Sequence, residues 1–182
     1  KEHFGSFQTL SNIIITVNDS KTPMIIKEKI RTNYENEKNP DQCITKLFDG
    51  NMTNKWFADN EKFTGSRKFP CIIQWAYTYA PRLTSYELTS ANDMPGRDPK
   101  SWKLYGSIDG ESYTLLDEQL GIFWPEKDNN SKENRHKKKS FPLKADRYRF
   151  FKMEINELVD NNQKPQLAEI NMSYGESHSD YN

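Results

Sequence analysis

The stretch Trp102-Lys-Leu-Tyr-Gly106-Ser-Ile-Asp109-Gly110 decides the fold that the sequence predicts. Trp102 and Leu104 alternate with polar or smaller residues, which is the period-two pattern of a strand with one buried face. The dipeptide Asp109-Gly110 favours a tight reversal, because glycine accepts the left-handed backbone that such turns require. The stretch therefore predicts an antiparallel β-hairpin.

Alternation of apolar and polar residues continues on both sides of this hairpin. The other predicted strands cover residues 13–17, 24–30, 73–79, 86–88, 113–116, 151–155 and 168–174. Helical character is confined to a turn or two near residues 40–47. Many short strands separated by turns are typical of an antiparallel sandwich, so we predict an all-β fold.

Length and charge narrow the classes of function. The chain has 182 residues, and its 26 basic and 26 acidic side chains give no net charge. Such a balance argues against a nucleic-acid partner, and no apolar run is long enough to predict a membrane span. Because the sequence begins at Lys1, we interpret it as a fragment of a longer protein, with one domain over residues 1–175 and a flexible tail over 176–182.

The reactive side chains predict no catalytic centre. Cys71 lies in an apolar strand, which favours a buried thiol, although a disulfide between Cys43 and Cys71 stays open. The three histidines have no metal-ligand or triad spacing. No nucleophile lies at a useful spacing from a base, so we predict that the chain is not an enzyme. The polar stretch 125–139 is predicted to be a solvated loop.

The hairpin is one of four pieces of sequence whose order along the chain is informative. They are Lys46-Leu-Phe-Asp49-Gly50-Asn51-Met-Thr-Asn54-Lys-Trp56, the hairpin at 102–110, Tyr148-Arg-Phe150-Phe151-Lys-Met-Glu-Ile155, and Gln166-Leu-Ala168-Glu169-Ile170. From residue 46 to residue 172 this order resembles the discoidin (coagulation-factor type-C) domains of the galactose-binding-like superfamily, and the similar family-32 carbohydrate-binding modules. The resemblance implies a jelly-roll β-sandwich of about eight main strands, with ligand-binding loops at one end. Trp56 and Trp102 are expected in its core.

The resemblance also implies a structural calcium ion near that end. Its ligands would be the side chains of Asp49, Asn54 and Glu169 and the main-chain oxygens of Lys46, Asn51 and Ala168. Calcium accepts six to eight hard oxygen ligands, which carboxylates and carbonyls supply. Asn54 stands where the family commonly has threonine, and its amide oxygen can serve the same ion. The alternative is a plain turn at Asp49-Gly50-Asn51 with Glu169 on the surface.

The loop 92–100 is the expected ligand loop. Its polar candidates are Asn92, Asp93, Arg97 and Asp98, and Trp124 is the candidate for an exposed aromatic platform, with Phe57 and Phe63 as alternatives. Sugar hydroxyls need polar partners, while an apolar sugar face stacks on a ring. The alternative for Arg97 and Asp98 is an ion pair within the loop. The loop pattern is not the galactose type, so the sugar stays open.

These observations predict a non-catalytic, calcium-stabilised module that binds a glycan or glycoprotein, as a lectin-like part of a glycan-processing enzyme or a cell-adhesion protein. The alternative is a docking module of the same fold that binds another protein. Asp49 and Glu169 could also be taken for a catalytic carboxylate pair, but the calcium site explains both together with Gly50. Sequons at Asn18, Asn51, Asn129 and Asn171 suggest an extracellular or cell-surface location, with an intracellular one left open.

Overall fold

The structure is a computed structural model that describes residues 22–124, 135–144 and 146–175. Its strands are β1 (Arg31–Thr32), β2 (Trp56–Phe57), β3 (Cys71–Ala76), β4 (Leu83–Thr89), β5 (Pro99–Ser107), β6 (Thr114–Gln119), β7 (Lys138–Pro142), β8 (Phe150–Leu158), β9 (Gln166–Leu167) and β10 (Glu169–Tyr174). Its helical turns are of the 3-10 type: η1 (Lys27–Lys29), η2 (Pro40–Gln42), η3 (Ile44–Phe48) and η4 (Pro95–Arg97). The predicted helical turn near residues 40–47 corresponds to η2 and η3.

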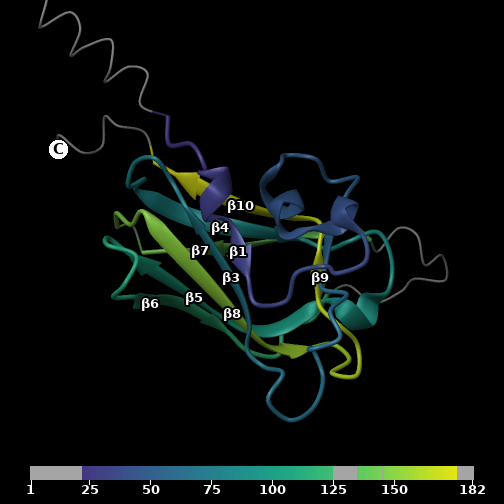
Figure 1. Cartoon of the computed structure of the whole chain (residues 1–182). Coiled ribbons are helices and arrows are strands. Elements are labelled where there is room, and N and C mark those ends of the chain that lie inside the picture. Colours follow the sequence, from purple (N-terminus) through teal and green to yellow (C-terminus); the bar gives the residue numbers. More distant parts are fainter. Residues whose placement is uncertain (1–21, 125–134, 145, 176–182) are drawn as a thin grey trace, which may run out of the picture.

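The strands form two facing sheets and a small third one (Figure 1). The five-stranded sheet has the order β1-β3-β8-β5-β6, and the three-stranded sheet has the order β10-β4-β7. Strands β2 and β9 pair separately, and the pairings are antiparallel. The prediction of an all-β antiparallel sandwich is confirmed.

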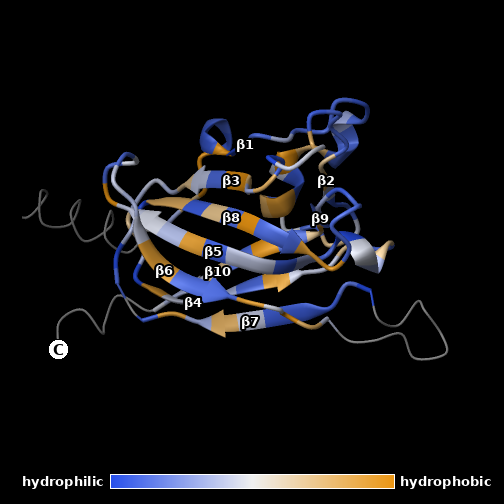
Figure 2. Ribbon diagram, turned by 90° about the horizontal axis from the view of Figure 1, so that it is seen from below, coloured by the Kyte–Doolittle hydropathy of each residue, from blue (hydrophilic) through white to orange (hydrophobic). Residues whose placement is uncertain are grey.

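Large aromatic side chains fill the space between the sheets, and apolar and polar residues alternate along the strands (Figure 2). Trp75 and Phe151, from the paired strands β3 and β8, stack with ring centroids 5.7 Å apart. The buried Trp102 indole donates a hydrogen bond to the Tyr86 hydroxyl at 2.8 Å. Trp56 and Trp102 are both fully buried, as predicted, because each can remove a large apolar area from water only in the core.

Two local predictions need correction, and two others fall on residues that the structure does not describe. The segment 125–139 was expected to be all loop, yet Lys138 and Lys139 begin β7, an edge strand paired with β4. The pairing of this edge strand is hidden from a pattern search, because Lys138 is exposed, Lys139 is half-buried and only Phe141 is buried. Segment 24–30 forms a single bridge and η1 rather than a strand. The predicted strand 13–17 and tail 176–182 lie outside the described residues.

The sandwich has two distinct ends. Pro99 of β5 pairs with Leu158 of β8 at one end, so the loop 90–98 and the loop 159–165 meet there. At the opposite end, Ser107 of β5 pairs with Phe150 of β8. Both ends of the described chain lie at this second end: Thr78 donates to the Met24 carbonyl, and Gly175 donates to the Arg82 carbonyl. We call these the β2–β9 end and the terminal end.

Two further predictions concern the cysteines and the membrane. Cys71 is buried, Cys43 is half-buried, and both are free thiols, so the open disulfide alternative does not hold in this structure. Burial raises the pKa of the Cys71 thiol, which keeps it protonated. In the described part of the chain, no helix is long and apolar enough to cross a membrane. The location of the protein stays a prediction.

Candidate functional site

The first predicted constellation is a corner where η3 meets the start of β10. Asp49 ends η3, and Gly50 follows with a positive φ of 72°, which lets the chain turn back on itself. The Asn51 amide then donates to Asp49 Oδ1 at 2.9 Å and to Glu169 Oε1 at 3.1 Å. One backbone N–H therefore bridges two carboxylates that lie 120 positions apart in the sequence, 169 minus 49.

Oxygen atoms at this corner lack partners. Asn54 donates its amide N–H to Asp49 Oδ2 at 2.6 Å, which leaves Asn54 Oδ1 buried without a hydrogen bond. Glu169 Oε2 is likewise buried and without a partner, on a side chain that is 1% exposed. Burial and the neighbouring Asp49 carboxylate raise the pKa of Glu169 to about 9. Buried oxygens left unsatisfied are costly, so the corner has the chemistry of a cation site.

Calcium fits this donor set better than a transition metal. Among the described residues, no group of three or more histidine, cysteine, aspartate or glutamate side chains could hold a metal. The corner instead offers two carboxylates and an amide oxygen, with backbone nearby from η3 and from Ala168. Hard oxygen donors of mixed charge suit calcium, which also accepts main-chain carbonyls.

The second predicted constellation lies at the β2–β9 end. Asp93 Oδ1 accepts a hydrogen bond from Lys55 Nζ at 2.8 Å, and the same ammonium donates to Gln166 Oε1 at 2.9 Å. The Gln166 amide donates in turn to the Asp93 carbonyl at 2.7 Å. Asp93 is therefore fixed to β9 through a buried lysine and a buried glutamine, although half of its own side chain stays exposed.

Arg97 lies beside this cluster on η4. Its guanidinium carbon is 4.0 Å from the centroid of the Phe57 ring, which is the geometry of a cation–π contact. Two of its N–H groups reach Gln163 and Gln166 side-chain oxygens at 3.4 Å. Arg97 and Phe57 are both half-buried, so they form part of the surface of the β2–β9 end. Asn92 is exposed at the start of the same loop.

Asp98 does not face solvent, contrary to its place among the ligand-binding candidates. It is 0% exposed and forms a bidentate ion pair with Arg135, at 2.6 Å and 3.2 Å. The alternative of an ion pair with Arg97 is also wrong, because Arg97 stacks on Phe57 instead. Burial raises the pKa of the Asp98 carboxyl to about 7, and Arg135 opposes that rise. Asp98 is an internal anchor of the loop.

Trp124 is also misplaced by the sequence prediction. Its ring is 6% exposed, and its indole N–H donates to the Pro99 carbonyl at 2.7 Å. Phe63, one of the two alternatives, is buried against Tyr34 and Phe69. Among these three candidate rings, Phe57 alone reaches the surface, and Arg97 covers one of its faces. None of these three rings offers the flat exposed platform that was expected, whereas the ring of Phe123, next to Trp124, is 61% exposed.

Comparison with known proteins identifies solved structures that share this fold. No family model matches the chain. Several solved structures match this chain over nearly their whole length. One is a family 32 carbohydrate-binding module from Clostridium perfringens in complex with GalNAc-β-1,3-galactose, with a TM-score of 0.62 at 14% identity, over 82% of this chain and 99% of that one. The family 32 module of NanJ from the same organism, in complex with galactose, matches with a TM-score of 0.60 at 14% identity, over 83% of this chain and 98% of that one. The chain has the family 32 carbohydrate-binding module fold.

Two further comparisons complete the family 32 assignment of the fold. The family 32 module of EndoD from Streptococcus pneumoniae has a TM-score of 0.58 at 13% identity, over 84% of this chain and 96% of that one. A peptide-N(4)-(N-acetyl-β-glucosaminyl)asparagine amidase of Arabidopsis thaliana is 32% identical over 142 residues, which is 75% of this chain. The chain spans 18% of the length of that amidase. The predicted resemblance is confirmed at the level of the fold, and the three solved neighbours named here are carbohydrate-binding modules.

Three residues of the β2–β9 end were missed by sequence reasoning on this family 32 fold. Lys55 adjoins Trp56, and Gln166 adjoins Leu167, inside two of the segments that carry the resemblance. Their positions next to core residues could have indicated that these two polar side chains are buried. No sequence signal indicated Arg135, because it lies in a charged run and pairs with Asp98 only in the folded chain.

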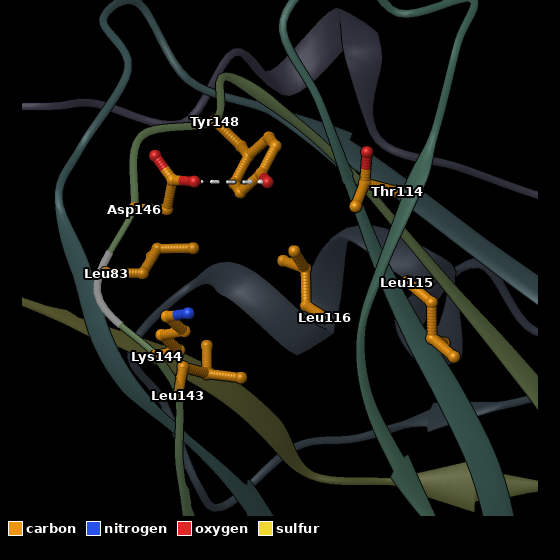
Figure 3. A pocket seen from close by; sticks show the side chains of 8 residues that line it. All are labelled: Leu83, Thr114, Leu115, Leu116, Leu143, Lys144, Asp146 and Tyr148. Atoms are coloured by element: carbon orange, nitrogen blue, oxygen red, sulfur yellow. Dashed lines mark hydrogen bonds between the residues drawn. The ribbon is translucent and has the colours of Figure 1, made fainter.

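The terminal end contains a hollow of about 260 Å³ (Figure 3). Leucine side chains and a polar rim line it: Leu83, Leu115, Leu116, Leu143, Thr114, Lys144, Asp146 and Tyr148. The Tyr148 hydroxyl lies 3.4 Å from Asp146 Oδ2. The Tyr148 ring also packs against Gly106 of β5, where a Cβ atom would stand 2.7 Å from Tyr148 Cγ and 2.8 Å from Leu116 Cδ1. The close approach of this ring to the strand requires glycine.

We expect Gly106→Ala to lower the free energy of unfolding by roughly 1–3 kcal/mol, because the added methyl group overpacks the junction of Tyr148 and Leu116. Denaturant unfolding measures the loss. In a Tyr148→Ala background the same substitution should cost clearly less, since the rigid ring is gone. An equal cost in both backgrounds would show that the contact with Tyr148 is not the cause.

Proposed function

We propose that this chain is a non-catalytic glycan-binding module that binds its ligand through the loops at the β2–β9 end and carries a structural calcium ion. The observation that carries the proposal is the fold match to family 32 modules, which covers most of this chain and nearly all of each module. Two of these modules were solved in complex with galactose-containing ligands. The polar array of Asn92, Asp93 and Arg97 supports the same end of the sandwich in this chain.

The class of glycan is taken from the amidase. Its name specifies a substrate in which N-acetylglucosamine is joined to asparagine. A binding module that holds such a glycan would raise the local concentration of the substrate near an attached active site. We therefore propose N-linked glycans, on glycoproteins, as the ligands, and a longer glycan-processing protein as the setting.

Calcium would be held by the carboxylates of Asp49 and Glu169 and by Asn54 Oδ1, with the main-chain oxygens of Lys46, Asn51 and Ala168. The support is the pair of buried oxygens without partners and the adjacency of two carboxylates. When bound, the ion would neutralise both carboxylates. The residues themselves would then tie the turn after η3 to the start of β10, close to β2 and β9.

A glycan array and calorimetry test the proposal. The folded chain should bind N-linked glycans, weakly and reversibly, and a free oligosaccharide should compete. A well-folded chain that stays silent over the whole array would contradict it. A co-purifying protein that free sugar fails to displace would instead favour the docking alternative, which the shortage of exposed rings among the three candidate aromatics supports.

A further inference from the structure

Some charged side chains of the β2–β9 end form ion pairs, and others do not. Lys55 and Asp93 form one ion pair at 2.8 Å, and Arg135 and Asp98 form a second at 2.6 Å. Both acidic groups therefore have a basic partner, and both basic partners have side chains at most 10% exposed. Arg97, on η4, takes part in neither pair.

The guanidinium of Arg97 is only partly satisfied. Within the residues that the structure describes, no carboxylate lies within ion-pair distance of it. Its polar contacts are the two long ones, at 3.4 Å, to neutral amide oxygens of Gln163 and Gln166. A guanidinium carries five N–H donors in a planar fork, so several remain for a ligand.

Arg97 is also held in place before any ligand binds. Phe57 supports one face of the guanidinium at 4.0 Å, and the Arg97 amide donates to the Met94 carbonyl at 2.9 Å. The neighbouring Gly96 packs so closely on the loop after β8 that a Cβ there would be 3.0 Å from Asp160 Cβ. Asp160 also donates its amide to the Gly96 carbonyl at 2.8 Å. A cation fixed in this way loses little conformational entropy on binding.

We propose that the ligand of the β2–β9 end is an acidic glycan, whose carboxylate, sulfate or phosphate group is received by the Arg97 guanidinium. The inference rests on the proposed glycan-binding function and names the charge of its ligand. A planar guanidinium fork matches two oxygens of an oxyanion, and a charge-assisted pair in a half-buried setting is stronger than a neutral hydrogen bond. Lys55 and Arg135 cannot take this role without giving up Asp93 and Asp98.

The test compares glycans that differ in one group. Calorimetry would use a neutral complex N-glycan, the same glycan capped with sialic acid, and the same glycan carrying a sulfate or phosphate ester. We expect at least one acidic form to bind about tenfold or more tightly than the neutral parent. Arg97→Gln should abolish this preference, so that the acidic and neutral forms bind with similar affinities.

Arg31→Gln is the matched control, because it removes the same charge from an exposed position on β1. It should retain the preference for the acidic form. Thermal melting checks that both variants fold. If Arg97→Gln fails to fold, Arg97→Lys replaces it: the charge remains, the planar fork is lost, and the preference should fall.

The outcomes separate the two proposals. A preference for the sialylated form identifies a carboxylate as the acidic group, and a preference for the ester identifies sulfate or phosphate. Equal affinity for neutral and acidic forms, or a preference that survives in Arg97→Gln, overturns the acidic-ligand inference while the glycan-binding function stands. Failure of a folded chain to bind any of the glycans overturns both.

Discussion

Chelation of calcium should lower the melting temperature of this 182-residue chain by roughly 10 °C. A cation that binds only the folded chain stabilises it by about 3–4 kcal/mol when its free concentration is some hundreds of times its dissociation constant. In a chain of this size, each kcal/mol corresponds to about 2–4 °C. Differential scanning calorimetry in 1 mM calcium and in chelator measures the difference.

Glu169→Gln gives this prediction a sharp control. The variant keeps the shape of the side chain but can no longer supply a carboxylate to calcium next to Asp49. Its melting temperature should no longer respond to calcium. In chelator it should melt close to the wild-type temperature, because a Glu169 carboxyl with a pKa of about 9 is already protonated and uncharged at neutral pH. Glu118→Gln, on an exposed side chain, should respond to calcium like the wild type. A wild-type chain that melts identically with and without calcium would refute the site.

Asp98→Ala should lower the free energy of unfolding by about 3–5 kcal/mol, which is the usual cost of breaking a buried ion pair by removing one partner. The reason is that the Arg135 guanidinium, with a side chain 6% exposed, would lose its bidentate carboxylate without reaching water. Urea denaturation followed by tryptophan fluorescence measures the change. The loop at the β2–β9 end should loosen as well, since Asp98 is its internal anchor.

The matched control is the exposed pair of Lys103 and Glu118, whose side chains are both 40% exposed at a separation of 3.7 Å. Glu118→Ala should cost less than about 1 kcal/mol, because solvent screens surface pairs. A similar small loss in Asp98→Ala would mean that water or a neighbouring group replaces the carboxylate. In that case Asp98 would not be the anchor of the loop.

The alternation of apolar and polar residues, together with the residues typical of turns, was sufficient to predict the sandwich from the sequence. The hairpin around Asp109-Gly110 is present as β5 and β6, and the inward tryptophans follow from the alternation along their strands. Ile108 is 75% exposed, because β5 ends at Ser107 and the next residue already belongs to the turn. Strand β7 was missed because an edge strand with one buried residue has almost no period-two signal.

The candidate sites also include residues that the sequence placed correctly and residues that it misplaced. Asp49 and Glu169 were expected to meet because the resemblance fixes the order of their segments, and the structure brings them to one backbone N–H. Asp98 and Trp124 were taken for surface groups, but their exposure depends on Arg135 and Pro99, which contact them only in the folded chain. The polarity of a side chain in a loop does not reveal whether its partner is water or another segment.

The described chain begins and ends at one end of the sandwich, and the candidate ligand loops lie at the other. Residues 22 and 175 leave the fold at the terminal end, while Asn92, Asp93 and Arg97 face outward at the far end. In the proposed function, the glycan would therefore bind at the end of the sandwich opposite to residues 22 and 175. The length of the sandwich would separate the bound sugar from the points where the described chain begins and ends.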